Sequence, residues 1–195
     1  MKLQAFLPLV TYTDPNADAV AANAAAVAAL IGADLNALAV NVTIPQVSNA
    51  LSRFLLDVPD MIRQAETTSR RHAERLVEAV EAAAKTAGVA VTAETIADTP
   101  PLLGATAALR ARYHDLSLVG LEAENPTSRS TAESVVFGSG RPVVLLPETV
   151  DAGAFDHVAV AWDGSRVAAR AVADARPFLA RARRVSVLTV VDEKP

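Results

Sequence analysis

Two hydrophobic periods alternate along the chain. Short runs of apolar, often β-branched residues, beginning with Leu3–Thr11 and Leu35–Ile44, predict strands that are buried on both faces. The alanine-rich segment between them, Ala17–Ile31, predicts a helix that ends at Gly32. We place Asp14 at the N-cap of this helix, because its side chain can accept a hydrogen bond from the first helical turn.

The same alternation continues to about residue 147 and defines a fold class. The further predicted elements are helices over 61–87, 102–113 and 132–137, strands over 89–96, 116–121 and 142–146, a connecting segment over 45–60, and a loop over 122–131. Strands that alternate with helices are typical of parallel sheets. The sequence therefore predicts an α/β fold with an open five-stranded parallel sheet and helices on both faces, similar to Rossmann-like and adenine-nucleotide-binding domains.

The pattern then restarts, which indicates an internal repeat. A shift of 150 residues without a gap places Val10 on Val160 and Leu38 on Leu188. The second copy is predicted to contain a strand over 157–162, a turn over 163–165, a helix over 167–181 and a strand over 185–191. We therefore expect one domain over 1–147, a linker over 148–154 and an additional β-α-β unit over 155–195.

Composition narrows the function classes. The formal net charge is −4, which argues against a nucleic-acid-binding protein. Hydrophobic residues make up 51% of the chain and charged residues 21%, as in folded globular proteins. The absence of cysteine excludes disulfides and thiolate sites, and the apolar run at the N-terminus is too short to span a membrane. We expect a cytoplasmic protein that binds neither nucleic acid nor membranes.

Three stretches carry a family resemblance. FDHVAVAWDGSRVAARAVADARPFLARARRVSVLTVVD (155–192) resembles the opening of a universal stress protein domain, and SLVGLEA (117–123) and ESVVFGSGRPVVLLP (133–147) resemble its fourth strand and its last helix and strand. This resemblance implies a complete first domain and the start of a second, as in tandem members of the family. It also implies a stress-response function and a homodimer, with Val143–Leu146 as the edge strand at the interface.

The resemblance also suggests a phosphate loop of the form G-x2-G-x9-G-[ST], found in ATP-binding members. Gly120 matches the first glycine, whereas Ala123 stands at the second. Alignment of the last strand places Arg129 and Ser130 at the final pair and leaves the loop shorter than the motif. Glycines and a helix N-terminus bring backbone amides to phosphates, so these departures indicate a degenerate site.

Further positions complete the candidate nucleotide site. The gapless repeat places Thr13 opposite Asp163, the aspartate that ends the first strand in the family. The full candidate set is Thr13, Asp14, Val42, Gly120, Ser128, Arg129, Ser130, Gly138 and Ser139, with Asp163, Gly164 and Ser165 in the second copy. Glu122 and Glu124 follow the fourth strand and would repel phosphates there, and we interpret them as part of a solvated loop.

Three functions remain open. The first is a non-catalytic stress-response module that dimerises and binds an unidentified protein partner. The second is a sensor that binds ATP or another adenine nucleotide with Mg²⁺, using a rearranged loop of Gly120, Ser128, Ser130, Gly138 and Ser139. The third is an enzyme that joins an acid or amide to AMP, for which the sequence offers no catalytic residues. The three histidines do not have metal-ligand spacing.

Overall fold

A computed structural model describes residues 2–45, 58–149 and 155–190 of the chain. The chain divides into two compact units, Met1–Ala152 and Gly153–Pro195. The predicted connecting segment over 45–60 and the predicted linker over 148–154 fall mostly outside the described residues. Each unit is described by itself below.

The first unit is built on a parallel sheet of five strands in the order β3-β2-β1-β4-β5. The strands are β1 (Leu3–Val10), β2 (Ala33–Val42), β3 (Val91–Asp98), β4 (Leu116–Leu121) and β5 (Val143–Pro147). β1 pairs with β2 in register from Leu3 opposite Ala33 to Val10 opposite Val40. The predicted α/β fold class is therefore confirmed.

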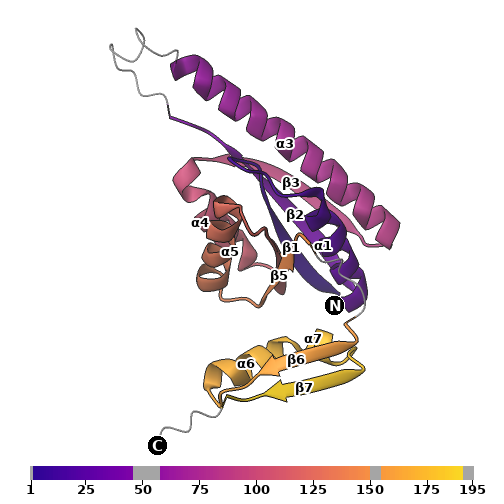
Figure 1. Ribbon diagram of the computed structural model, residues 1–195. Helices are drawn as coiled ribbons and strands as arrows, with labels where there is room; N and C mark the ends of the chain where they lie inside the picture. Colours follow the sequence, from indigo (N-terminus) through magenta and orange to yellow (C-terminus); the bar gives the residue numbers. More distant parts are fainter. Residues whose placement is uncertain (1, 46–57, 150–154, 191–195) are drawn as a thin grey trace, which may run out of the picture. The chain divides into compact units, whose positions relative to one another are not determined.

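Helices cover both faces of this sheet (Figure 1). They are α1 (Asp18–Ile31), α3 (Val58–Ala87), α4 (Leu103–Ala111) and α5 (Pro126–Gly138), with a short 3-10 turn, η1 (Pro100–Leu102), before α4. α1 packs against α3 on one face, and α4 packs against α5 on the other. Small residues permit the second contact, since a Cβ on Gly104 would lie 2.5 Å from the Ser134 Oγ.

The core explains why the strands read as continuous apolar runs. Leu7, Leu35 and Leu118 are fully buried, because their strands lie in the interior of a sheet covered on both faces. On the α4 and α5 face, Phe6, Leu38 and Val119 pack with alanines of both helices. Edge strand β5 is less covered, and Leu145 remains 42% exposed.

Two sequence-based assignments in this unit are wrong. Asp14 does not cap α1, which begins at Asp18 after Ala17 as N-cap, without a hydrogen bond from that residue's side chain. The segment 122–131 is not a loop throughout, because α5 begins at Pro126. The Asn125 Oδ1 accepts a hydrogen bond from the Ser128 N–H at 2.9 Å and caps this helix. The Asn-Pro pair is a cap followed by a first-turn proline, a signal that the polar composition of the segment obscured.

The second unit contains two parallel strands, β6 (His157–Ala161) and β7 (Arg184–Leu188), joined by α6 (Arg166–Asp174) and α7 (Arg176–Leu179). The predicted single helix over 167–181 is interrupted at Ala175, because Pro177 cannot continue the backbone hydrogen bonds of α6. Within this unit, none of the residues described is buried.

The internal repeat contains a gap. Paired residues are 30 positions apart in β1 and β2, as in Leu7 and Ala37, but 27 apart in β6 and β7, as in His157 and Arg184. A repeat without a gap would pair Leu188 with Val158. In the structure, Leu188 pairs with Ala161. The loop before α1, over 11–17, is longer than the loop before α6, over 162–165, and Asn16 lies in the longer loop.

No helix in the described part of the chain is long and apolar enough to cross a bilayer.

Candidate functional site

The candidate site lies at the carboxyl edge of the first sheet, between β1 and β4. From β1 the chain builds outward to β2 and β3, and then returns to add β4 and β5 on the other side. Open α/β sheets bind ligands in the crevice where this direction changes. The loops over 11–17 and 122–125 flank this crevice.

Asn16 folds the first loop back onto the end of β1. Its backbone N–H donates to the Val10 carbonyl at 3.0 Å, and its Oδ1 accepts from the Val10 N–H at 2.7 Å. Asn16 is only 1% exposed. By contrast, the predicted nucleotide residues Thr13 and Asp14 are exposed, and the Thr13 hydroxyl donates to the Asp14 carboxylate at 3.2 Å. Asn16 is therefore a buried polar residue of this loop, and sequence reasoning missed it.

Glu122 crosses the crevice from the second loop. Its Oε1 accepts hydrogen bonds from the Asn16 Nδ2 at 2.9 Å and the Ala17 N–H at 3.0 Å, and its Oε2 lies 3.1 Å from the same Asn16 nitrogen. Glu122 is 5% exposed, so the interpretation of it as a solvated loop residue is wrong, whereas Glu124 is exposed. Its donors lie 105 and 106 positions away in the sequence, and no local pattern could have identified them.

Asn125 and Ser128 complete the contact between the loops. The Asn125 Nδ2 donates to the Asp14 carbonyl at 2.9 Å. The Ser128 hydroxyl accepts from the Glu122 N–H at 3.1 Å and donates to the Gly120 carbonyl at 3.3 Å. Ser128 is fully buried, so its hydroxyl is engaged within the protein rather than presented to a phosphate.

Gly120 is held by packing. A Cβ at this position would lie 2.8 Å from the Val20 Cγ2 and 2.9 Å from the Asn16 Nδ2. Helix α1 therefore approaches β4 too closely for any side chain. This close approach is by itself a sufficient reason for a glycine at position 120, whether or not a nucleotide binds.

The remaining candidates do not converge on the crevice. Arg129 and Ser130 belong to the first turns of α5 but are exposed. Gly138 and Ser139 lie at the opposite end of that helix, about 15 Å from Ser128 at the usual helical rise. The structure therefore does not bring this pair together with Gly120 and Ser128. Val42 is buried at the end of β2, where its N–H donates to the Ser69 Oγ at 3.0 Å.

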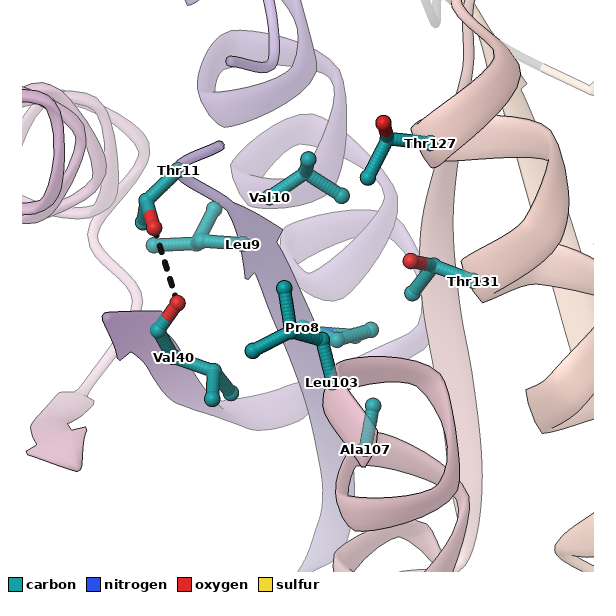
Figure 2. Close-up of a pocket in the computed structure, with 9 residues that line it drawn as sticks. All are labelled: Pro8, Leu9, Val10, Thr11, Val40, Leu103, Ala107, Thr127 and Thr131. Carbon is teal, nitrogen blue, oxygen red and sulfur yellow. Dashed lines mark hydrogen bonds between the residues drawn. The ribbon is translucent and has the colours of Figure 1, made fainter. Parts of the chain in front are cut away.

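Figure 2 shows the pocket beside the crevice on the α4 and α5 side. It is lined by Pro8, Leu9, Val10, Thr11, Val40, Leu103, Ala107, Thr127 and Thr131. The cavity measures about 10 Å³, which is close to the room that a single water requires. Small-molecule sites usually enclose about 300–1,000 Å³. With these side-chain positions, the described residues leave no room for an adenine ring in this pocket.

The second unit keeps the turn that the sequence singled out. The Ser165 N–H donates to the Asp163 Oδ1 at 2.8 Å, and the Ser165 Oγ caps α6 by accepting from the Ala168 N–H at 3.1 Å. Hydrogen bonding from the Ser165 side chain, and then from its backbone N–H, lowers the pKa of Asp163. Gly164 occupies the left-handed region with φ of +76°. Asp163 and Ser165 border an open depression of about 380 Å³.

Among the described residues, no three His, Asp or Glu side chains are grouped to hold an ion. Each histidine has a structural contact instead. The His72 Nδ1 lies 3.0 Å from the Thr11 carbonyl, the His114 ring stacks on Phe6, and the His157 Nε2 lies 2.9 Å from the Ser186 hydroxyl.

The chain is similar to solved structures, although the sequence matches no protein-family model and no curated protein. A universal stress protein from Archaeoglobus fulgidus superposes with a TM-score of 0.65 at 17% identity, covering 97% of this chain and 68% of that one. A universal stress protein from Lactobacillus plantarum gives 0.49 at 22% identity, covering 75% and 99%. A universal stress protein in complex with cAMP gives 0.46 at 15% identity, covering 76% and 100%.

Only the first of these similarities is close enough to carry an argument. It extends over both units of this chain and agrees with the strand order and parallel pairing described above. At 17% identity, the similarity concerns the fold and not the ligand. The chain therefore has the fold of the universal stress proteins.

Proposed function

We propose that this protein is a stress-response module of the universal stress protein type that acts without catalysis, through dimerisation and the binding of a protein partner. The observation that carries the proposal is the closed crevice between β1 and β4. Glu122, Asn16, Asn125 and Ser128 satisfy one another there, and the neighbouring cavity measures about 10 Å³. A buried carboxylate at this place also opposes a phosphate electrostatically.

The proposed dimer interface is the free edge of β5. The Ser117 N–H donates to the Pro142 carbonyl, and Ser117 pairs with Val143 in the parallel ladder between β4 and β5. In such a ladder the N–H and C=O groups of Val143 and Leu145 point away from β4. An exposed apolar edge of this kind favours pairing with a second copy.

The second unit supports a tandem arrangement. It repeats the order strand, helix, parallel strand of β1, α1 and β2, and its described residues bury no side chain. Because a two-stranded parallel sheet is not stable alone, we infer that 155–195 is the beginning of a second domain of the same type, after a linker over 148–154. A cytoplasmic location belongs to the proposal and agrees with the absence of cysteine.

The experiment that tests the proposal is a measurement of nucleotide content followed by titration. The protein is purified, denatured and assayed for released adenine nucleotide, and the stripped protein is titrated with Mg-ATP by calorimetry. We expect less than about a tenth of an equivalent of nucleotide and no binding up to millimolar Mg-ATP. Near-stoichiometric ATP or cyclic nucleotide would overturn the proposal in favour of an adenine-nucleotide sensor.

A further inference from the structure

The carboxyl ends of α4 and α5, which lie side by side in Figure 1, carry exposed aromatic and aliphatic side chains. Phe137 is 87% exposed, Tyr113 is 79% exposed and Leu109 is 49% exposed. Leu109 lies in the last turn of α4, Tyr113 follows that helix, and Phe137 is the penultimate residue of α5. Single exposed apolar residues are common, but a group of them that includes two aromatic rings is typical of a protein contact surface.

Two arginines tie these helix ends together. The Arg112 Nε and Nη2 donate to the Gly138 carbonyl at 3.2 and 3.0 Å, and the Arg141 Nε donates to the Arg112 carbonyl at 3.0 Å. Tyr113 follows Arg112 in the chain, and Phe137 precedes Gly138. The two guanidinium groups and the two aromatic residues therefore belong to one surface.

Neither guanidinium group has a carboxylate partner. Arg112 and Arg141 are exposed, and among the described residues no Asp or Glu oxygen lies within 4.0 Å of either side chain. Asp115, which is near in the sequence, is occupied by the Gln4 N–H at 2.8 Å. Because a backbone carbonyl holds each Nε, terminal N–H groups of both arginines remain available, and the planar guanidinium group matches the geometry of a carboxylate.

We propose that Leu109, Arg112, Tyr113, Phe137 and Arg141, here called the helix-end surface, dock an acidic segment of the protein partner. Asp or Glu side chains of this segment pair with the two guanidinium groups, and its apolar side chains cover the aromatic rings. Tyrosine and arginine are among the residues that contribute most to binding energy in interfaces. The inference rests on the proposed function, because it names the chemistry of the partner that this function requires.

Charge favours an acidic partner over another part of the same protein. The described residues of the second unit include six arginines and three aspartates, so that unit has the wrong sign of charge for the helix-end surface. A two-fold contact between two helix-end surfaces would bring identical arginines together, and like charges repel. An acidic segment from a different protein meets neither obstacle, and opposite charges also accelerate its association.

Peptide selection tests the surface in the full chain. A random peptide library displayed on phage is selected on the wild-type protein, and the enriched peptides are synthesised and measured by fluorescence anisotropy. We expect the enriched peptides to combine Asp or Glu with Trp, Phe or Leu. Substitution of both arginines, Arg112→Ala with Arg141→Ala, should weaken their binding at least tenfold. Added sodium chloride should also weaken binding, because salt screens exposed charges.

Variants of the aromatic part and of the opposite helix ends complete the test. Phe137→Ala should weaken binding at least fivefold without a change in Tm, because this side chain is 87% exposed, and it carries the test if the arginine double variant does not fold. Arg129→Ala removes an exposed arginine from the first turn of α5. Leu102→Ala shortens a 50% exposed leucine directly before α4. Both of these controls should bind the peptides like the wild type.

Each outcome decides the inference. Enrichment of peptides without acidic residues, enrichment of no peptide, or equal affinity for the wild type and the folded variants would overturn it. Binding to vesicles of phosphatidylcholine and phosphatidylserine that is lost in the same variants would assign the surface to a membrane and would also overturn it. Binding of Mg-ATP to the wild type would contradict the proposed function but would not alter the peptide result, so the two failures are distinguishable.

Discussion

The hydroxyl oxygens of Thr11 and Ser69 lie 2.8 Å apart and join the end of β1 to helix α3. Both residues are buried, and each hydroxyl has a second partner in β2. The Thr11 Oγ1 donates to the Val40 carbonyl at 2.8 Å, and the Ser69 Oγ accepts from the Val42 N–H at 3.0 Å. Two side chains thus satisfy backbone groups of β2 where that strand ends.

Ser69→Ala should destabilise the protein by about 1–3 kcal/mol, because the buried Val42 N–H loses its acceptor. The measurement is the free energy of unfolding from urea denaturation. Ser130→Ala is the matched control, since the Ser130 side chain is exposed on α5. It should change stability by less than about 0.5 kcal/mol. Equal stability of both variants and the wild type would show that the contact is not needed.

Gly120→Ala should cost about 1–3 kcal/mol, because its Cβ would lie 2.8 Å from the Val20 Cγ2. A second change checks the cause. Val20→Ala removes the opposing methyl groups, so the double variant should be more stable than the sum of the single effects predicts. Additive effects, measured by thermal unfolding of all four proteins, would indicate that the clash is relieved elsewhere and that Gly120 has another role.

Long hydrophobic patterns could be predicted from the sequence, and pairs of distant polar residues could not. The apolar runs of β1, β2 and β4 gave the correct fold class, because a buried parallel strand requires apolar residues on both faces. Gly120 was predicted as a phosphate-loop residue, and its close contact with α1 could not be read from the sequence.

The candidate site was less predictable, because its central contact joins residues 106 positions apart. The residues next to Glu122 in the sequence do not show whether its carboxylate is exposed to solvent or buried against the start of a helix. Asn16 was equally hidden, because the carboxylate that its side chain binds belongs to a distant part of the chain. The cap at Asn125 could have been found, since a proline follows it directly.

Ser165→Ala should raise the pKa of Asp163 toward its ordinary value, because hydrogen bonding from the Ser165 side chain is the largest cause of its lowered pKa. A carboxyl group whose pKa is lowered in the folded state stabilises the fold at pH values above its pKa in the unfolded chain. This stabilisation is lost as the pH falls through the folded-state pKa. The measurement is an NMR titration of the Asp163 carboxyl carbon. Ser165→Thr keeps the hydroxyl and should keep the low pKa, and an unchanged pKa in Ser165→Ala would contradict the assignment.

Leu145→Lys should weaken the proposed dimer at least tenfold. Leu145 is 42% exposed on β5, whose outward N–H and C=O groups are available to a second copy. Across a two-fold axis the new lysines lie near each other, and like charges on paired strands are destabilising. The measurement is sedimentation velocity from micromolar to millimolar protein.

The matched control for this interface is Leu109→Lys. Leu109 is 49% exposed on α4, away from the free edge of β5, so this variant adds the same charge and removes a similar apolar area without touching the strand. We expect it to dimerise like the wild type. The β5 edge would be excluded as the interface if the wild-type protein stayed monomeric throughout, or if the two variants had the same dissociation constant. The search for a partner surface would then turn to the exposed strands β6 and β7.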